Sequence, residues 1–123
     1  GTDLAKVLNI SIIYFDLDKW NIRPDAAEDL EKIIAVMKQY PTMVVDIRSH
    51  TDSRQTHKYN ELLSDRRAKS TLEFMVKNGI SRSRLTAKGY GENQLINNCA
   101  DDVPCSEEEH QKNRRSEFIV IKM

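Results

Sequence analysis

The feature that most constrains the fold is an alternating apolar run at residues 43–49, which is followed closely by a long helical pattern. Apolar side chains recur at every second position of the run, which predicts a strand with one wetter face. Thr56 is a suitable N-cap and Asn78-Gly79 a suitable helix stop, so a helix is expected between them. Residues at helical spacing are expected to form its buried stripe: Ser64, Ala68, Thr71, Leu72 and Met75. This region is therefore expected to run from strand to loop to helix.

The remaining pattern predicts a two-layer α+β fold. Residues 10–15 are largely apolar on both alternating sets, as in a central strand, and residues 24–40 carry helix start and stop signals around one apolar stripe. Two more strands are expected at residues 85–91, where two glycines add flexibility, and at residues 118–121, with a polar insertion at residues 92–112 between them. The order β-α-β-α-β-β then gives an α/β sandwich: a mixed sheet with both helices packed on one face.

Length and charge limit the possible partners. The 123 residues suffice for one domain, with residues 1–9 expected as a lead-in segment and residues 10–123 as the domain itself. Lys plus Arg and Asp plus Glu both number 19, so the formal net charge is zero. This balance argues against nucleic-acid binding by phosphate neutralisation and against anionic lipid as the main partner. No apolar run approaches the roughly 20 residues of a membrane helix, and Gly1-Thr2-Asp3 lacks the features of a signal peptide.

Three polar residues of the predicted long helix share one face, near the loop carboxylate of Asp52. Asn60, Ser64 and Arg67 follow one another at steps of four and three, so their side chains line up. A carboxylate facing a guanidinium can bind a zwitterion, with the ammonium at Asp52 and the carboxylate at Arg67. The alternative is that Asp52 and Arg67 form a structural ion pair. Arg67 lies beside the buried stripe, so it is expected to be partly shielded from water.

Two cysteines lie in the polar insertion. Cys99 and Cys105 flank a turn-rich segment with Pro104, which favours a small disulfide loop and hence an oxidising compartment. A zinc site that includes His110 is one alternative, although no fourth ligand is evident. Two free thiols are the other. The acidic run Glu107-Glu108-Glu109 could open a short helix.

Five ordered motifs resemble the OmpA-like C-terminal domain, a family that includes the peptidoglycan-associated lipoproteins and the peptidoglycan-binding part of flagellar stator proteins. The resemblance extends from about Ile10 to Lys122. Its motifs are Tyr14-Phe15-Asp16, Ile22-Arg23-Pro24, Thr51-Asp52 with Asn60-x-x-Leu63-Ser64-x-x-Arg67-Ala68, Gly89-Tyr90-Gly91, and Asn113-Arg114-Arg115-Ser116-Glu117. Each motif alone is short, and their common order and spacing make the match specific.

The resemblance implies a site for meso-diaminopimelate in the stem peptide of peptidoglycan. Asp52 would hold the ammonium and Arg67 the carboxylate at the free side-chain end of this residue, with no cofactor. The further implied contacts are hydrogen bonds from Asn60, an apolar wall from Leu63 and Phe15, and a polar contact from Asp18. The family usually has a glycine three residues after the aspartate, where this chain has Gln55. If the family backbone requires φ > 0 at that position, Gln55 carries strain of roughly 1–2 kcal/mol; otherwise the loop takes another path.

The expected function is non-covalent peptidoglycan binding that tethers the outer membrane, or a larger envelope protein, to the cell wall. The domain would then lie on the periplasmic side of the outer membrane of a Gram-negative cell, reaching a membrane only through an anchor or barrel region outside this sequence. The alternative is a periplasmic protein-interaction module without cell-wall binding. An enzyme is not expected, because Ser49 and His50 are adjacent on a strand and point to opposite faces.

Overall fold

The computed structural model describes residues 3–4, 13–14, 19–54, 56–91, 97, 99–100, 103–113 and 115–123. Its elements are β1 (Ile13–Tyr14), α2 (Pro24–Gln39), β2 (Val44–Ser49), α3 (His57–Lys77), the 3-10 helix η1 (Arg82–Arg84), β3 (Leu85–Gly89), α4 (Glu107–Gln111) and β4 (Arg115–Lys122). The predicted order is confirmed, and α4 begins at the acidic run Glu107-Glu108-Glu109, which the sequence offers as the start of a short helix.

The four strands form one mixed sheet in the order β1-β4-β2-β3 within the described ranges, so β1 lies at an edge and the prediction of a central strand at residues 10–15 was wrong. β4 runs antiparallel to both β1 and β2, whereas β2 and β3 are parallel. The parallel pair is possible because α3 returns the chain to the same end of the sheet between the two strands. β2 is consequently a central strand, and its carboxyl end leads into the loop that carries Asp52.

α2 begins at Pro24, whose fixed φ suits a first helical position and whose missing N–H loses no helical hydrogen bond there. The helix ends at Gln39 because the next residue, Tyr40, precedes Pro41 and has left the helical region. The apolar residues between these ends recur at helical spacing and are buried: Ala26, Leu30, Ile33, Ile34 and Met37.

α3 has both of the end signals expected from the sequence. The Thr56 hydroxyl accepts a hydrogen bond from the backbone N–H of Tyr59 at 3.1 Å. At the other end, Asn78 is the C-cap and Gly79 adopts φ 104°, a left-handed value that favours glycine. The predicted buried stripe is confirmed except at Leu72, which is half-buried.

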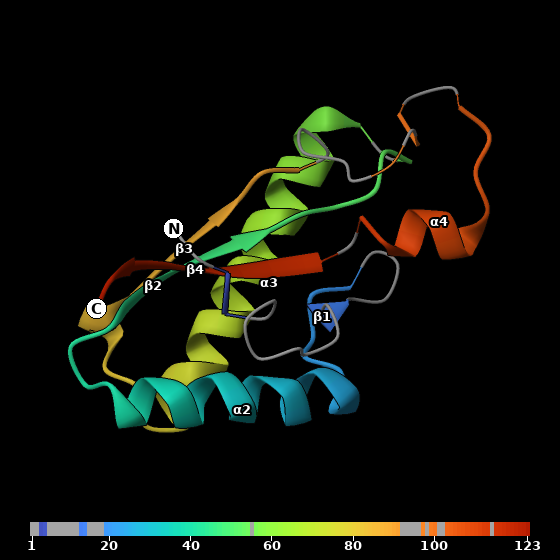
Figure 1. The fold of residues 1–123 in the computed structure, drawn as a ribbon. Coiled ribbons are helices and arrows are strands. Elements are labelled where there is room, and N and C mark those ends of the chain that lie inside the picture. The colour runs from blue at the N-terminus through green and yellow to red at the C-terminus, as the bar shows by residue number, and fades with distance from the viewer. Residues whose placement is uncertain are drawn as a thin grey trace.

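One core joins the two long helices to the sheet. Figure 1 shows α3 crossing behind the strands and α2 running along their lower edge, while α4 stands at the end of the sheet where β2 finishes. Leu4, in the segment expected as a lead-in, packs into this core, and Asp3 bridges to Ile119. The predicted two-layer α+β fold with a mixed sheet is therefore confirmed.

β4 is longer than the strand predicted at residues 118–121. It begins with Arg115 and Ser116, which are both buried, and the Ser116 hydroxyl lies 2.7 Å from that of Ser49 on β2. Because these buried residues are polar, the apolar periodicity of the sequence does not mark them as strand.

Candidate functional site

The loop after β2 is fixed by its own backbone. The N–H of His50 donates to the carbonyl of Arg115 at 2.8 Å, and the N–H of Thr51 donates to the carbonyl of Gly91 at 2.9 Å. The next residues, Asp52 and Ser53, are buried. Because its main chain is held from two sides, this loop presents the Asp52 carboxylate from a fixed position.

The Asp52 carboxylate is bound by Arg54, a residue that the sequence did not single out. One carboxylate oxygen accepts from the Arg54 backbone N–H at 3.1 Å, and the other accepts from Nε at 3.3 Å and Nη2 at 2.9 Å. Nη1 of the same guanidinium lies 2.7 Å from a carboxylate oxygen of Glu107 at the start of α4. Arg54 therefore links the loop carboxylate to the polar insertion.

Arg67 is completely buried, although the sequence predicted only partial shielding. Its Nε donates to the carbonyl of Lys19 at 2.8 Å and its Nη1 donates to the carbonyl of His50 at 3.2 Å. The sequence underestimates the burial of Arg67 because helical spacing describes only contacts within the helix itself. The chain around Lys19 and the β2 loop add cover from outside it.

Asn60 connects α3 to the same loop. Its side-chain amide donates to the backbone carbonyl of Asp52 at 3.1 Å, and the residue is buried. Leu63, the predicted wall residue, is also buried on α3. α3 thus holds the loop at two points, through Asn60 at the Asp52 carbonyl and through Arg67 at the His50 carbonyl.

The structure brings together Asp52, Asn60, Leu63 and Arg67 around the β2–α3 loop. Phe15, Asp18 and Gln55 lie outside the described residues, so the roles expected for Phe15 and Asp18 and the departure at Gln55 stay predictions. The Asp52 carboxylate and the Arg67 guanidinium are therefore held on one rigid support, and both side chains are buried.

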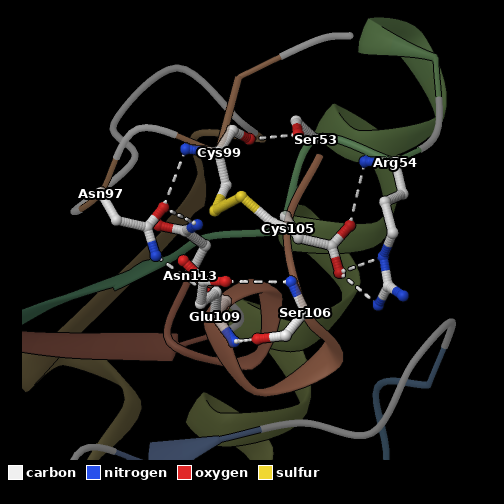
Figure 2. The surroundings of a disulfide bond; sticks show 9 residues. Ser53, Arg54, Asn97, Cys99, Cys105, Ser106, Glu109 and Asn113 are labelled. Carbon is white, nitrogen blue, oxygen red and sulfur yellow. Dashed lines mark hydrogen bonds and ion pairs between the residues drawn. A yellow bond between two sulfur atoms is a disulfide. The ribbon is translucent and has the colours of Figure 1, made fainter. Parts of the chain in front are cut away.

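Cys99 and Cys105 form the predicted disulfide. Because both sulfur atoms are used in this bond, they are neither free thiols nor thiolate ligands for zinc. Figure 2 shows the bond beside the β2–α3 loop, where the Ser53 hydroxyl donates to the backbone carbonyl of Cys99. The disulfide-closed insertion therefore contacts the β2–α3 loop through Ser53 and, independently, through Arg54.

His50 is buried at the end of β2, between Glu117 and Tyr90. Its Nε2 lies 2.5 Å from a Glu117 carboxylate oxygen, its ring stacks on Tyr90 with centroids 5.6 Å apart, and its Nδ1 has no hydrogen-bond partner among the described residues. Burial lowers the pKa of His50 below its ordinary value. The hydrogen bond to Glu117 opposes this effect, and the charge of Arg115 adds to it.

His50 is expected to make the fold less stable as the pH falls below about 6.5. The unfolded chain takes up a proton on this imidazole near pH 6.5, whereas the folded chain resists protonation until a lower pH. The unfolded state then binds more protons, so the stability contributed by neutral His50 is present above this window and is lost within it. Between about pH 7.5 and about pH 5.5, the Tm from thermal melts should fall more steeply for the original protein than for His50→Gln. Parallel pH profiles would contradict this expectation.

A separate hollow of about 390 Å³ is lined by Glu61, Asp65, Lys88, Gly89 and Tyr90. It contains none of the predicted site residues. The Tyr90 ring is already contacted by His50 and by the Lys88 ammonium, which lies 5.3 Å from the ring centroid.

Comparisons with known proteins place these features in a family. Outer membrane porin F of Pseudomonas fluorescens is 36% identical over 118 residues, covering 95% of this chain and 35% of that protein. The peptidoglycan-associated lipoprotein of Agrobacterium fabrum is 34% identical over 108 residues, covering 88% of this chain and 58% of that protein. The chain therefore spans less than two thirds of the length of either relative. In the described part of the chain, no helix has the length and apolar composition needed to cross a membrane.

The fold is shared with a solved structure, the crystal structure of the peptidoglycan-associated lipoprotein from Burkholderia pseudomallei. The two superpose with a TM-score of 0.82 over 92% of each chain, at 22% sequence identity. The family model of the OmpA family matches residues 14–114, which include the β2–α3 loop and the whole of α3. The chain belongs to the OmpA family.

Proposed function

We propose that this domain binds peptidoglycan non-covalently through the meso-diaminopimelate of the stem peptide. In this proposal the Asp52 carboxylate binds the ammonium at the free end of the diaminopimelate side chain, and the Arg67 guanidinium binds the carboxylate there. Asn60 adds hydrogen bonds, while Leu63 and Phe15 form the apolar wall and Asp18 adds a polar contact. The proposed activity is non-covalent binding, without catalysis or a cofactor.

The observation that carries the proposal is the shared support of Asp52 and Arg67. Arg67 donates to the carbonyl of His50 and Asn60 donates to the carbonyl of Asp52, so α3 fixes the loop at two points. The two opposite charges of the site are consequently held in a constant relation before any ligand arrives. Preorganised, buried charges bind a complementary zwitterion more strongly than mobile ones, because less ordering is needed on binding.

The relatives support a role in the cell envelope. One is named an outer membrane porin and another a peptidoglycan-associated lipoprotein. We propose that the domain lies on the periplasmic side of the outer membrane and links that membrane, or a larger envelope protein, to the cell wall. The disulfide supports this placement, because such bonds persist in oxidising compartments such as the periplasm.

The test is a comparison of two soluble stem peptides that differ only in the third residue. A lysine peptide keeps the ammonium but lacks the second carboxylate, so it would leave the buried Arg67 without its ligand partner. Losing a partner for a buried charge costs roughly 1–3 kcal/mol, which corresponds to roughly tenfold to hundredfold weaker binding. Calorimetry should therefore show that the diaminopimelate peptide binds more tightly than the lysine peptide by about this factor.

Two further measurements separate binding from its alternatives. Asp52→Asn should weaken binding of both peptides, because both carry the ammonium. Pelleting with purified sacculi tests the cell-wall interaction directly. Equal affinity for the two peptides would contradict the assigned site, and failure to pellet with sacculi would favour an interaction module without cell-wall binding.

A further inference from the structure

The Arg54 guanidinium lies between two carboxylates of very different exposure. Asp52 has a side chain only 4% exposed, whereas that of Glu107 is 57% exposed, and Arg54 itself is 31% exposed. Arg54 contacts Asp52 through Nε and Nη2 and contacts Glu107 through Nη1. One cation is therefore shared by two anions, and it occupies acceptor positions of the Asp52 carboxylate that the proposed function assigns to a ligand ammonium.

We infer that Arg54 is an internal competitor that sets the affinity and the charge selectivity of the site. The inference rests on the proposed function of Asp52. An entering ammonium takes the place of the Arg54 guanidinium on Asp52, and Glu107 keeps the displaced guanidinium. The charges then balance, since two cations face two carboxylates where one cation faced both. A ligand whose amine is acetylated brings no positive charge and cannot make this exchange.

Contacts within the polar insertion fix the backbone position of Glu107, which this exchange requires. Glu107 is the first residue of α4, and the helix is capped by Ser106, whose hydroxyl accepts from the Glu109 N–H at 3.1 Å while the Glu109 carboxylate accepts from the Ser106 N–H at 3.0 Å. The disulfide precedes this cap directly, and Cys99 accepts the hydrogen bond of Ser53 in the binding loop. Glu107, which would accept the displaced guanidinium, is thus linked to the β2–α3 loop through the disulfide and Ser53.

The first test is Arg54→Gln, which removes the competing charge and leaves the backbone hydrogen bond to Asp52 available. Calorimetry with a soluble stem peptide that ends in meso-diaminopimelate should show about fivefold tighter binding, the factor expected for releasing a partly exposed ion pair. The matched control is Arg82→Gln, which removes the same charge from an exposed pair with Glu73 at the far end of α3. The control should bind as the original protein does. Circular dichroism and thermal melts establish that both variants fold.

The second test has the opposite sign. Glu107→Gln removes the alternative partner and leaves Arg54 to Asp52 alone, so peptide binding should weaken by about the same factor. In an Arg54→Gln background, the same Glu107 substitution should not change peptide affinity, because the protein then has no Arg54 guanidinium for the Glu107 carboxylate to bind. Glu108→Gln, an exposed neighbour on α4, serves as the charge control. Equal weakening by Glu107→Gln in both backgrounds would mean that Glu107 contacts the ligand directly, and it would overturn the exchange.

The outcomes distinguish this inference from the proposed function. If the original protein binds the diaminopimelate peptide and Arg54→Gln binds equally or more weakly, Arg54 does not compete and only the inference fails. If neither protein binds the peptide, the proposed function fails and the inference fails with it. If Arg54→Gln binds the peptide and the original protein binds it weakly or undetectably, both the proposed function and the inference are supported.

Discussion

Gly89→Ala is expected to destabilise the fold by about 3 kcal/mol or more. A Cβ at this position would lie 2.2 Å from the backbone nitrogen of Asp65, and 2.3 Å from the hydroxyl oxygen and 2.5 Å from the carbonyl carbon of Ser64. Two of these three atoms belong to the α3 backbone and cannot rotate away, so the helix and β3 must separate. Thermal unfolding should show a fall in Tm on the order of 10 °C or more.

Gly79→Ala provides the comparison for this prediction. Gly79 has φ +104°, so alanine there carries backbone strain of roughly 1–2 kcal/mol, but its Cβ would meet only the flexible end of the Lys38 side chain. The smaller loss is therefore expected at Gly79. Equal losses at the two positions would show that backbone conformation, rather than the close approach of α3 to β3, determines the need for glycine.

The close approach at Gly89 also matters for the site, although Gly89 is not itself one of the proposed ligand residues. Gly89 pairs with Ser49 in the parallel register of β3 and β2, and the Ser64 hydroxyl accepts the N–H of Gly91 at 2.8 Å. These contacts set the height of α3 above the end of β2, from which Asn60 and Arg67 reach the loop. Gly89→Ala should therefore also weaken peptide binding in protein that remains folded.

Local periodicity accounts for the parts of the fold that the sequence predicts well. The alternation at residues 43–49 gives β2, and the capping signals at Thr56 and Asn78-Gly79 give both ends of α3, because these patterns depend on neighbours within one element. The family motifs also select Asp52 and Arg67, which the structure brings to one loop. The pattern likewise indicates the two glycines near the end of β3, but it attributes them to flexibility.

The remaining features depend on contacts between distant segments. Arg54 meets Glu107 across 53 positions of sequence, and Gly89 is required by a helix backbone that no local pattern reveals. Arg67 is buried by carbonyl groups at Lys19 and His50, whose positions follow only from the assembled fold. For Arg54, the one available signal was its place two residues after Asp52, where a side chain can turn back to a carboxylate.

Arg67→Ala is expected to affect both stability and ligand selectivity, because the same guanidinium has two kinds of partner. Truncation removes the donor of the part-buried hydrogen bond to Lys19 and leaves the buried carbonyl of His50 unsatisfied, which costs roughly 1–3 kcal/mol, and it also removes a large buried side chain. The free energy of unfolding should therefore fall by about 3 kcal/mol or more. At a temperature where the variant is still folded, its preference for the diaminopimelate peptide over the lysine peptide should largely disappear.

Arg67→Lys separates the two roles. Lysine keeps the positive charge but lacks the planar group that reaches two carbonyls in different directions, so it should recover only part of the lost stability. It should recover part of the preference for diaminopimelate as well, since a cation still faces the ligand carboxylate. If instead Arg67→Ala lowers the unfolding free energy and leaves the peptide preference intact, the guanidinium serves only the β2–α3 loop. The recognition of the ligand carboxylate would then have to come from another cation near this loop, and Arg54 is the first described residue to test in that role, because it already lies at Asp52.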